Sequence, residues 1–420
     1  MDAGARSGAG SGVGHAGDVP GAPPSTARLL ACGAVHLLVV LSIVPWRDDA
    51  IFDGGLDPVV AAKAVLSLTA LLAALVGHAL SRNRYPIGLG PASAVCVVLL
   101  VSALGSLIAG NAAATAVLVI RTLLLVAVVL LQLSTFSWST NLAALLGAMV
   151  AVAAGAALTG LPGLVEEGRL GGGIPQMHPN QLAGLAGPPL VATVVVILRR
   201  GVQMWSSVVA AVLLAIVVAT GSRTALLAIA VAVLVAVLAN GIRNRSVVYL
   251  LLGVAPVAYA VLLFTDVLDS LATRAGSTDT VSSLDSRLDA WKVVLSWGWG
   301  DWQKWIGLGL SVKQVPVDIK WRDEQVLDSS WVSVLAQAGL LGTAVLALLV
   351  GWCVLAATVS SRRRQILLPL LVLVVLRSVT ESGLIDSAVP FLLLLVLATM
   401  LTGRSRREAR AEGGAADGCA

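Results

Sequence analysis

The chain of 420 residues is 57% apolar and only 12% charged, with a net charge of +5 and a mean hydropathy of +0.91. Soluble proteins carry about 25% charged residues, so this composition excludes a set of water-soluble domains. The basic residues form no stripe that would bind nucleic acid, and the four cysteines show no CxxC or Cys/His metal spacing. The charges lie in short islands between long apolar runs, which is typical of a polytopic membrane protein.

Three regions follow from the composition along the chain. Residues 1–28 are rich in Gly, Ala, Ser and Pro and predict a disordered cytoplasmic tail. They lack the basic segment and short apolar core of a signal peptide. Residues 29–402 form one predicted transmembrane domain, and residues 403–420 form a basic cytoplasmic tail.

The predicted transmembrane domain contains twelve apolar runs, each near the about 20 residues that a membrane-spanning helix needs. They cover 29–46, 59–80, 92–110, 112–134, 141–162, 181–198, 204–220, 222–240, 246–266, 331–354, 365–380 and 384–402. The expected fold is therefore all-α, with about 12 transmembrane helices.

Alternate connections between these runs differ in charge. The basic set contains Arg82, Arg84, Arg199, Arg200, Arg243, Arg245, Arg362, Arg363 and Arg364, and the opposite set is mainly acidic. The positive-inside rule places the basic connections and both termini in the cytoplasm. The opposite, extracytoplasmic face is the expected active face.

One predicted outer connection, about 267–330, is much longer than a typical loop. Leu284, Leu288, Trp291 and Leu295 follow a helical spacing within it, and seven of the eleven tryptophans lie between Trp291 and Trp331. Tryptophan favours the membrane interface, and its ring also stacks on sugars. The two interpretations are compatible.

Charged residues inside predicted spans are costly and are usually functional or paired. Lys63, Arg121 and Arg377 fall within or at the edges of spans. Arg121 is the most central, and it is a candidate binding residue or one half of a buried pair whose partner the sequence does not identify.

The predicted outer face gathers a second set of polar residues. Its members are Arg169, His178-Pro179-Asn180, Gly221-Ser222-Arg223, Arg287-Leu288-Asp289-Ala290-Trp291 and Asp328-Ser329-Ser330-Trp331. Each has a structural alternative: Asn180 could cap a helix, Arg223 could reach lipid headgroups, and Arg287 could pair with Asp285 or Asp289.

Together these residue types suit one kind of chemistry. Guanidinium groups offer planar, paired donors to the oxygens of a diphosphate. A nearby carboxylate or imidazole can remove a proton from an attacking hydroxyl, and arginines can stabilise the departing diphosphate without a metal. This set predicts glycan transfer from a lipid diphosphate to a hydroxyl acceptor.

These segments, in this order, resemble the O-antigen ligase and O-antigen polymerase family of bacterial envelope enzymes. The resemblance covers roughly residues 165–345. It rests on Arg169 with Pro179-Asn180, Gly221-Ser222-Arg223, Arg287 to Trp291, and Asp328 to Trp331 followed by Gly339-Leu340-Leu341-Gly342.

The resemblance implies a bacterial plasma-membrane glycosyltransferase with the GT-C-type helical fold, no cofactor and no metal. Its expected partners are a polyprenyl-diphosphate-linked glycan donor, a glycan or lipid-glycan acceptor and membrane lipids. Arg223, Arg287 and Arg169 would bind the diphosphate. His178, Asn180, Trp291, Trp331 and Arg121 complete the expected substrate-binding set.

One position departs from the family pattern. A histidine that is thought to activate the acceptor is replaced by Asp328, and the following Asn by Ser329. Asp328 is the first candidate base, although its reference pKa of about 3.9 differs from about 6.5 for histidine. His178 is a second candidate, and Glu381 and Asp386 are further acids. A subgroup that needs no base here, or has lost activity, is the remaining possibility.

Ligase and polymerase share the donor chemistry, and the sequence does not separate them. The rival functional class is a lipid-linked sugar or polysaccharide transporter or flippase. The chain shows no clear repeat between its halves, and its polar set lies on one face, so both observations favour the enzyme. A non-catalytic member of the family is a third alternative.

Overall fold

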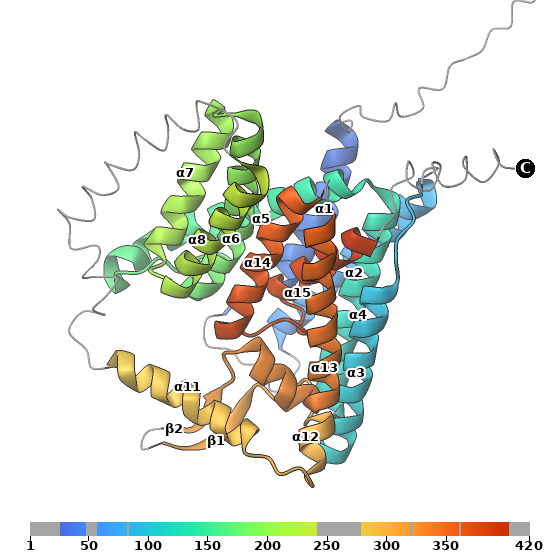
Figure 1. The fold of residues 1–420 in the computed structure, drawn as a ribbon, viewed down its shortest axis with the longest axis vertical. Coiled ribbons are helices and arrows are strands. Elements are labelled where there is room, and N and C mark those ends of the chain that lie inside the picture. The colour runs from blue at the N-terminus through green and yellow to red at the C-terminus, as the bar shows by residue number, and fades with distance from the viewer. Residues whose placement is uncertain are drawn as a thin grey trace, which may run out of the picture.

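A computed structural model describes residues 26–47, 57–81, 84–241, 279–319, 322–360 and 363–402. The bundle helices are α1 (Thr26–Ile43), α2 (Pro58–Leu80), α3 (Gly90–Ala109), α4 (Ala112–Thr135), α5 (Trp138–Glu167), α6 (Pro179–Arg200), α7 (Met204–Ala219), α8 (Arg223–Asn240), α13 (Ser330–Val359), α14 (Arg364–Thr380) and α15 (Val389–Thr402). The remaining elements are α11 (Asp279–Leu295), α12 (Trp302–Ile306), β1 (Gln314–Ile319) and β2 (Arg322–Val326) (Figure 1).

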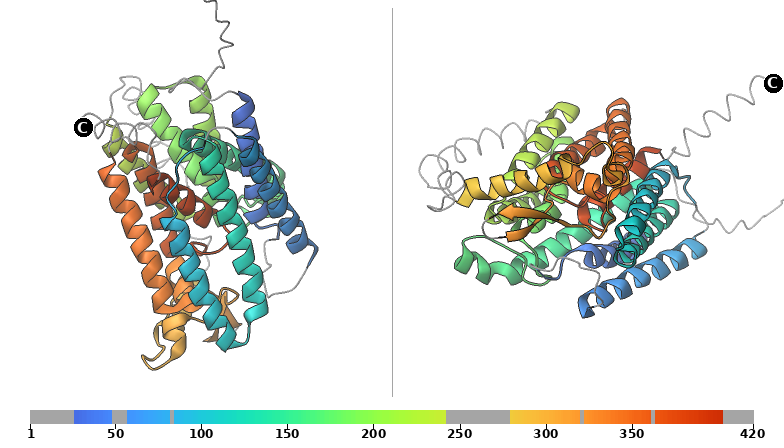
Figure 2. Two further views of the ribbon diagram at one scale, coloured as in Figure 1. Left: turned by 90° about the vertical axis from the view of Figure 1, so that its right-hand side faces the viewer. Right: turned by 90° about the horizontal axis from the view of Figure 1, so that it is seen from below.

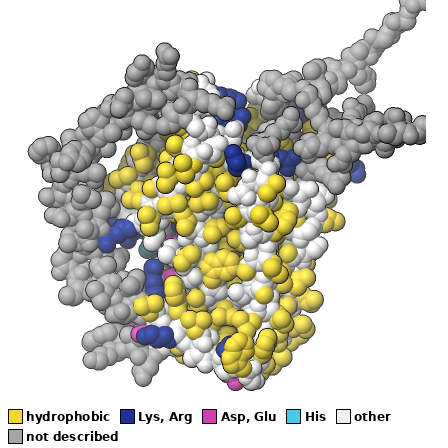
Figure 3. All heavy atoms as spheres, viewed as in Figure 1, with side chains coloured by type: hydrophobic (Ala, Val, Ile, Leu, Met, Phe, Trp, Pro, Cys, Tyr) yellow, Lys and Arg dark blue, Asp and Glu magenta, His cyan; other side chains and the backbone are white. Residues whose placement is uncertain are grey.

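The helices coincide with eleven of the predicted apolar runs, while the run 246–266 and most of both predicted tails lie outside the described residues. Eight described helices are long and apolar enough to cross a membrane, and α7 and α15 are shorter apolar helices. Exposed leucines and valines line α2, α3, α8 and α13, and one such apolar face is visible in Figure 3. A surface of this kind needs lipid rather than water around it. The chain is a polytopic membrane protein.

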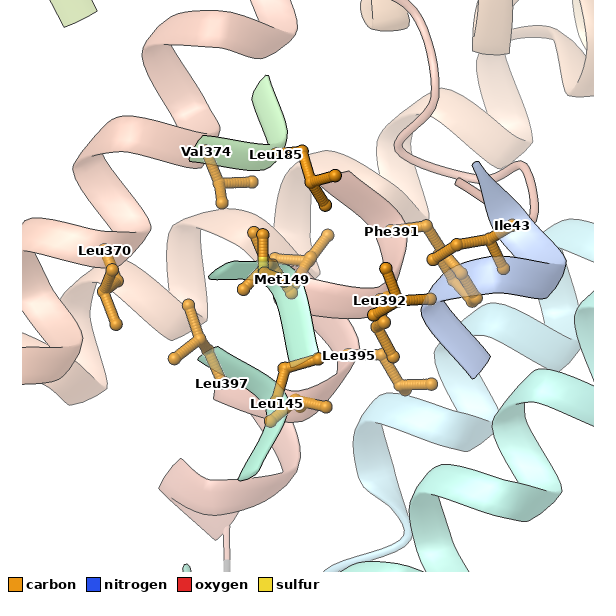
Figure 4. Close-up of a cluster of buried hydrophobic side chains, with 14 of the residues drawn as sticks. Ile43, Leu145, Met149, Leu185, Leu370, Val374, Phe391, Leu392, Leu395 and Leu397 are labelled. Carbon is orange, nitrogen blue, oxygen red and sulfur yellow. The ribbon is translucent and has the colours of Figure 1, made fainter. Parts of the chain in front are cut away.

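Helix α15 lies in the core of the bundle and contacts α3, α4, α6, α13 and α14. Residues 391–398 are all buried, as expected for a helix that is apolar on every side. Figure 4 shows its side chains among those of α1, α5, α6 and α14: Phe391, Leu392, Leu395 and Leu397 lie with Ile43, Leu145, Met149, Leu185, Leu370 and Val374. The predicted span began at 384, but the helix begins only at Val389, and the preceding segment is not helical.

The long predicted loop folds over one end of the bundle, at the bottom of Figure 1 and facing the viewer in the right-hand view of Figure 2. Strands β1 and β2 pair antiparallel, with Val315 opposite Gln325. Val315 and Val317 are buried against Ala290 and Val294 of α11. We call α11, α12 and the hairpin the end unit. The all-α prediction missed this hairpin, because two short strands leave only a brief period-2 pattern.

The two ends of the bundle differ in charge. Helices α6 and α14 run antiparallel. His178, which precedes α6, and Glu381, which follows α14, therefore lie at the same end of the bundle, the end that carries the end unit. Arg199, Arg200 and Arg364 lie at the other ends of these helices. Which of the two ends faces the cytoplasm stays a prediction.

Helix α13 is broken at Gly339, whose φ of +64° lies in the left-handed region. The break frees two carbonyls, and the chain after α12 supplies their partners: Leu308 N–H donates to Ala336 O at 2.8 Å and Gly309 N–H to Gln337 O at 3.0 Å. A non-helical backbone within a membrane bundle is tolerated where protein groups satisfy it in this way. The break therefore docks the end unit onto the bundle.

We expect Gly339→Ala to destabilise the protein by about 3 kcal/mol or more, because it adds left-handed strain and a backbone clash. A Cβ at this position would lie 2.2 Å from the carbonyl carbon of Trp305. Gly351→Ala in the same helix is the control: its Cβ would meet nothing within 4 Å. Unfolding in detergent would measure both, and equal stabilities would contradict the account of the break.

Candidate active site

Asp328 and Arg287 form an ion pair where the end unit meets the bundle. Arg287 Nε lies 2.9 Å from Asp328 Oδ2, and the side chains are 34% and 30% exposed. Helix α11 carries Arg287 and is held by Ala290 and Val294 against the hairpin. Asp328 follows β2 and precedes α13. The pair is thus made by tertiary packing.

The ion pair corrects the local alternatives considered for Arg287. Asp289 pairs instead with Lys292, at 2.8 Å and one turn away on the same exposed face. Spacing along one helix could suggest only neighbours such as Asp289, while the partner that Arg287 has in the structure comes from 41 positions further along the chain.

Burial raises the pKa of Asp328, and the nearby Arg287 and His178 charges oppose part of this rise. The carboxylate is therefore a stronger base than an exposed aspartate. Its pKa moves toward the range in which a proton acceptor works near neutral pH.

His178 is the N-cap of α6. Its Nδ1 accepts from Asn180 N–H at 3.3 Å, and the Gln181 side chain accepts from His178 N–H at 3.1 Å, which completes a capping box. The expectation that Asn180 could be the cap is wrong, because Pro179 starts the helix and His178 precedes it. The cap fixes His178 within electrostatic range of Asp328.

Asn180 and Glu381 join α6 to the end of α14. The Asn180 side chain lies beside the Glu381 carboxylate, and the Asn180 carbonyl accepts a hydrogen bond from Arg377 Nη2 at 2.9 Å. Ser330 donates through its N–H and its hydroxyl to the Glu381 carbonyl, at 3.1 and 2.6 Å. Burial raises the pKa of Glu381. Glu381 therefore lies close to Asp328, in reach of the same charges.

Arg169 contacts the turn that precedes Arg223. Arg169 Nε donates to the Thr220 carbonyl at 3.0 Å, and Leu170 N–H donates to the Ala219 carbonyl at 2.9 Å. A Cβ on Gly221, which has a φ of +61°, would lie 3.3 Å from Arg169 Nε. Arg223 is exposed and starts α8 directly after this turn. Arg169 thus positions the turn from which Arg223 extends.

Arg121 is half-buried in α4 and lies away from the Asp328 pair. It lines a small cavity with Ser42 and Ser387, in the electrostatic field of Asp386. Asp386 also forms an ion pair with Lys313 of the end unit. The ion-pair partner of Asp386 is thus Lys313, which sequence reasoning missed because it lies in a loop with no motif to mark it.

The two candidate tryptophans are half-buried. Trp291 packs with the core of the end unit, and Trp331 packs against the bundle while its Nε1 donates to Ser378 Oγ at 3.0 Å. Among the tryptophans that the structure describes in this segment, Trp299 and Trp305 are the most exposed; their ring centroids lie 5.9 Å apart, and Lys304 lies over the ring of Trp299. The surface available for stacking is therefore at α12.

Five of the candidate residues come together where the end unit meets the bundle. On the face drawn in Figure 3, basic, acidic and histidine side chains lie close together next to a region of apolar side chains. The five residues are Arg287, Asp328, His178, Asn180 and Glu381, which an ion pair or electrostatic interactions link to one another. Such a group can bind an anion and accept a proton in one place.

Comparison with known families finds a match over residues 208–347 to the family described as O-Antigen ligase. This segment includes Arg223, Arg287 and Asp328, while Arg169, His178, Asn180 and Glu381 lie outside it. No curated protein matches the chain.

Proposed function

We propose that this chain, which matches the O-antigen ligase family over residues 208–347, transfers a glycan from a polyprenyl diphosphate to a hydroxyl acceptor. The observation that carries the proposal is the pairing of Asp328 with Arg287 beside His178. It combines a half-buried base with a guanidinium that can bind phosphate.

The proposed reaction is a single displacement at the anomeric carbon. The acceptor oxygen bonds to that carbon while the bond to the diphosphate oxygen breaks, and Asp328 takes the hydroxyl proton. A guanidinium has five N–H donors, so the Arg287 Nε bond to Asp328 leaves others for the diphosphate. Arg223, which follows the turn that Arg169 holds through the Thr220 carbonyl, would also bind the diphosphate. The departing charge stays with these arginines.

The proposed location of the protein is the bacterial plasma membrane. The donor and the membrane lipids would reach the candidate site from the bilayer, and the glycan or lipid-glycan acceptor would reach it from the extracytoplasmic side. The basic ends of α6 and α14 lie at the other end of the bundle and would face the cytoplasm. In this orientation the end unit and its exposed tryptophans face the acceptor.

A transfer assay tests the proposal with purified protein in nanodiscs and a lipid diphosphate-linked oligosaccharide from the native host. We expect Arg223→Ala to lower the rate of transfer by about 10²-fold or more, because a donor to the leaving group is lost. Arg200→Ala, an exposed arginine at the opposite end of the bundle, is the matched control and should keep the wild-type rate.

The products of the assay also separate the alternatives. A ladder of repeated units indicates a polymerase, and a single addition to a lipid-glycan indicates a ligase. An intact donor that moves across the bilayer of a vesicle without transfer indicates a flippase and overturns the proposal. A native donor that neither reacts nor moves, with acceptors present, indicates a non-catalytic protein.

A further inference from the structure

Lys313 ends a segment of the end unit that the bundle holds in place. Besides the two backbone hydrogen bonds to the break in α13, Asn111 Nδ2 donates to the Leu308 carbonyl at 2.9 Å. Gln337 Nε2 donates to the Val312 carbonyl at 3.0 Å. These contacts join residues 308–312 to the start of α4 and to α13. The backbone position of Lys313 is therefore set by the bundle as well as by the end unit.

The Lys313 backbone also contacts the turn that carries Asp328. The Lys313 carbonyl accepts a hydrogen bond from Leu327 N–H at 3.0 Å, next to the pair of Gln314 and Val326 in the hairpin. Leu327 is 1% exposed and directly precedes Asp328. The chain on the N-terminal side of Asp328 is thus fixed to Lys313.

The Lys313 side chain reaches a different part of the bundle. Its Nζ forms an ion pair with Asp386 Oδ1, and the two side chains are 20% and 22% exposed. Asp386 lies in the connection between α14 and α15, residues 381–388, and it also interacts electrostatically with Arg121 of α4. Leu384 and Ile385 of this connection are buried. The ion pair therefore holds the end unit against a connection that is itself packed into the bundle.

The same connection returns to the other side of Asp328. It begins at Glu381, whose carbonyl accepts from the N–H and the hydroxyl of Ser330 at 3.1 and 2.6 Å. Ser330 follows Asp328 by two residues and is 1% exposed. The contacts form a closed ring around the turn 327–330, and the ion pair of Lys313 with Asp386 is the one link of this ring between two charged side chains.

We propose that Lys313 and Asp386 are positioning residues for the transfer reaction, because their ion pair closes the ring that holds Asp328 in place beside Arg287. Both act through the backbone on either side of Asp328 and not on the substrate. A displacement of about 1 Å in a reacting group can lower a rate by about 10²-fold, so a fixed turn matters for a base. The inference rests on the proposed function, which assigns the role of base to Asp328.

The transfer assay in nanodiscs gives the first test. We expect Lys313→Met and Asp386→Asn each to lower kcat by about tenfold or more, with the KM for the donor changed less than about twofold, because a base acts in the transition state. The double variant should be no slower than the slower single variant, since both substitutions break one contact. Lys313→Arg keeps the charge and should retain most of the rate. Lys292→Met, which affects an exposed ion pair of the same unit, is the control.

Hydrogen–deuterium exchange of the full chain in nanodiscs gives a second test that needs no turnover. The amides of Leu327 and Ser330 are the two donors that fix the turn. We expect both to exchange about tenfold faster in Lys313→Met and in Asp386→Asn, because the turn then opens without breaking the ion pair. Lys292→Met should exchange like wild type at these positions.

Unchanged exchange at Leu327 and Ser330 in both variants would overturn the inference, and so would faster exchange with an unchanged kcat. Losses of rate that multiply in the double variant would also contradict it, since they would show two independent effects. If Lys313→Met does not fold, Asp386→Asn and Lys313→Arg decide. A wild-type protein that transfers no glycan refutes the proposed function, while faster exchange in the variants would still support the ring around Asp328.

Discussion

Asp328→Asn is expected to lower the rate of glycan transfer by about 10²- to 10⁴-fold, which is the usual contribution of a positioned general base. The substitution keeps the shape of the side chain and its place beside Arg287 Nε, 2.9 Å away, but removes the ability to accept a proton. The transfer assay measures it directly. Asp289→Asn, which affects an exposed pair on α11, should retain the wild-type rate.

The pH profile adds a test that a merely structural role would not pass. The base works only when deprotonated, so activity is present above its pKa and is lost as the pH falls through it. Because burial raises the pKa of Asp328, the acid limb should lie above the ordinary aspartate value of about 3.9. Asp328→His should restore part of the activity and move the limb toward about 6.5. Full activity in Asp328→Asn would contradict the assignment of Asp328 as the base and would leave His178 and Glu381 as the candidates.

Arg287→Ala should lower the rate of transfer by about 10²- to 10³-fold, because a donor to the departing diphosphate is removed. Arg287→Lys should recover only a small part, since an ammonium cannot bind the carboxylate and a phosphate through one planar fork. Lys292→Ala on the same helix is the control, because Lys292 is exposed and forms its ion pair with Asp289, one turn away on the same helix.

Arg287→Ala should also change the pH dependence of the activity that remains. Arg287 lowers the pKa of Asp328, so its removal should raise that pKa and move the acid limb of the profile to higher pH. A limb that stays in place would show that the two side chains do not interact during turnover, even if the rate falls.

The candidate site shows where sequence reasoning succeeds and where it stops. Arg287 and Asp328 stand out as charged residues in recognisable segments, so both could be selected from the sequence. Their ion pair could not, because it joins α11 to the turn before α13 through the packing of a hairpin that leaves little trace in the sequence. The role of His178 as a helix cap was missed for a related reason, since Asn180 is the more familiar capping residue.

Arg377 illustrates the same limit. Its charge within an apolar run marks it as unusual, but only the structure shows which of its N–H groups have partners among the described residues. The space that Gly184 leaves for it, six residues after His178 and on a different helix from its own, has no signature in either segment. The sequence identifies the costly residue, and tertiary contacts identify its partner, the Asn180 carbonyl.

The sequence by itself determined that this is a polytopic membrane protein, where most of its helices lie and which family it resembles, because long apolar runs and short motifs are local patterns. The tertiary structure decided the break at Gly339, the docking of the end unit and the pairing of Asp328 with Arg287. These features depend on residues far apart in the chain. Their energies come from contacts that exist only once the helices have packed.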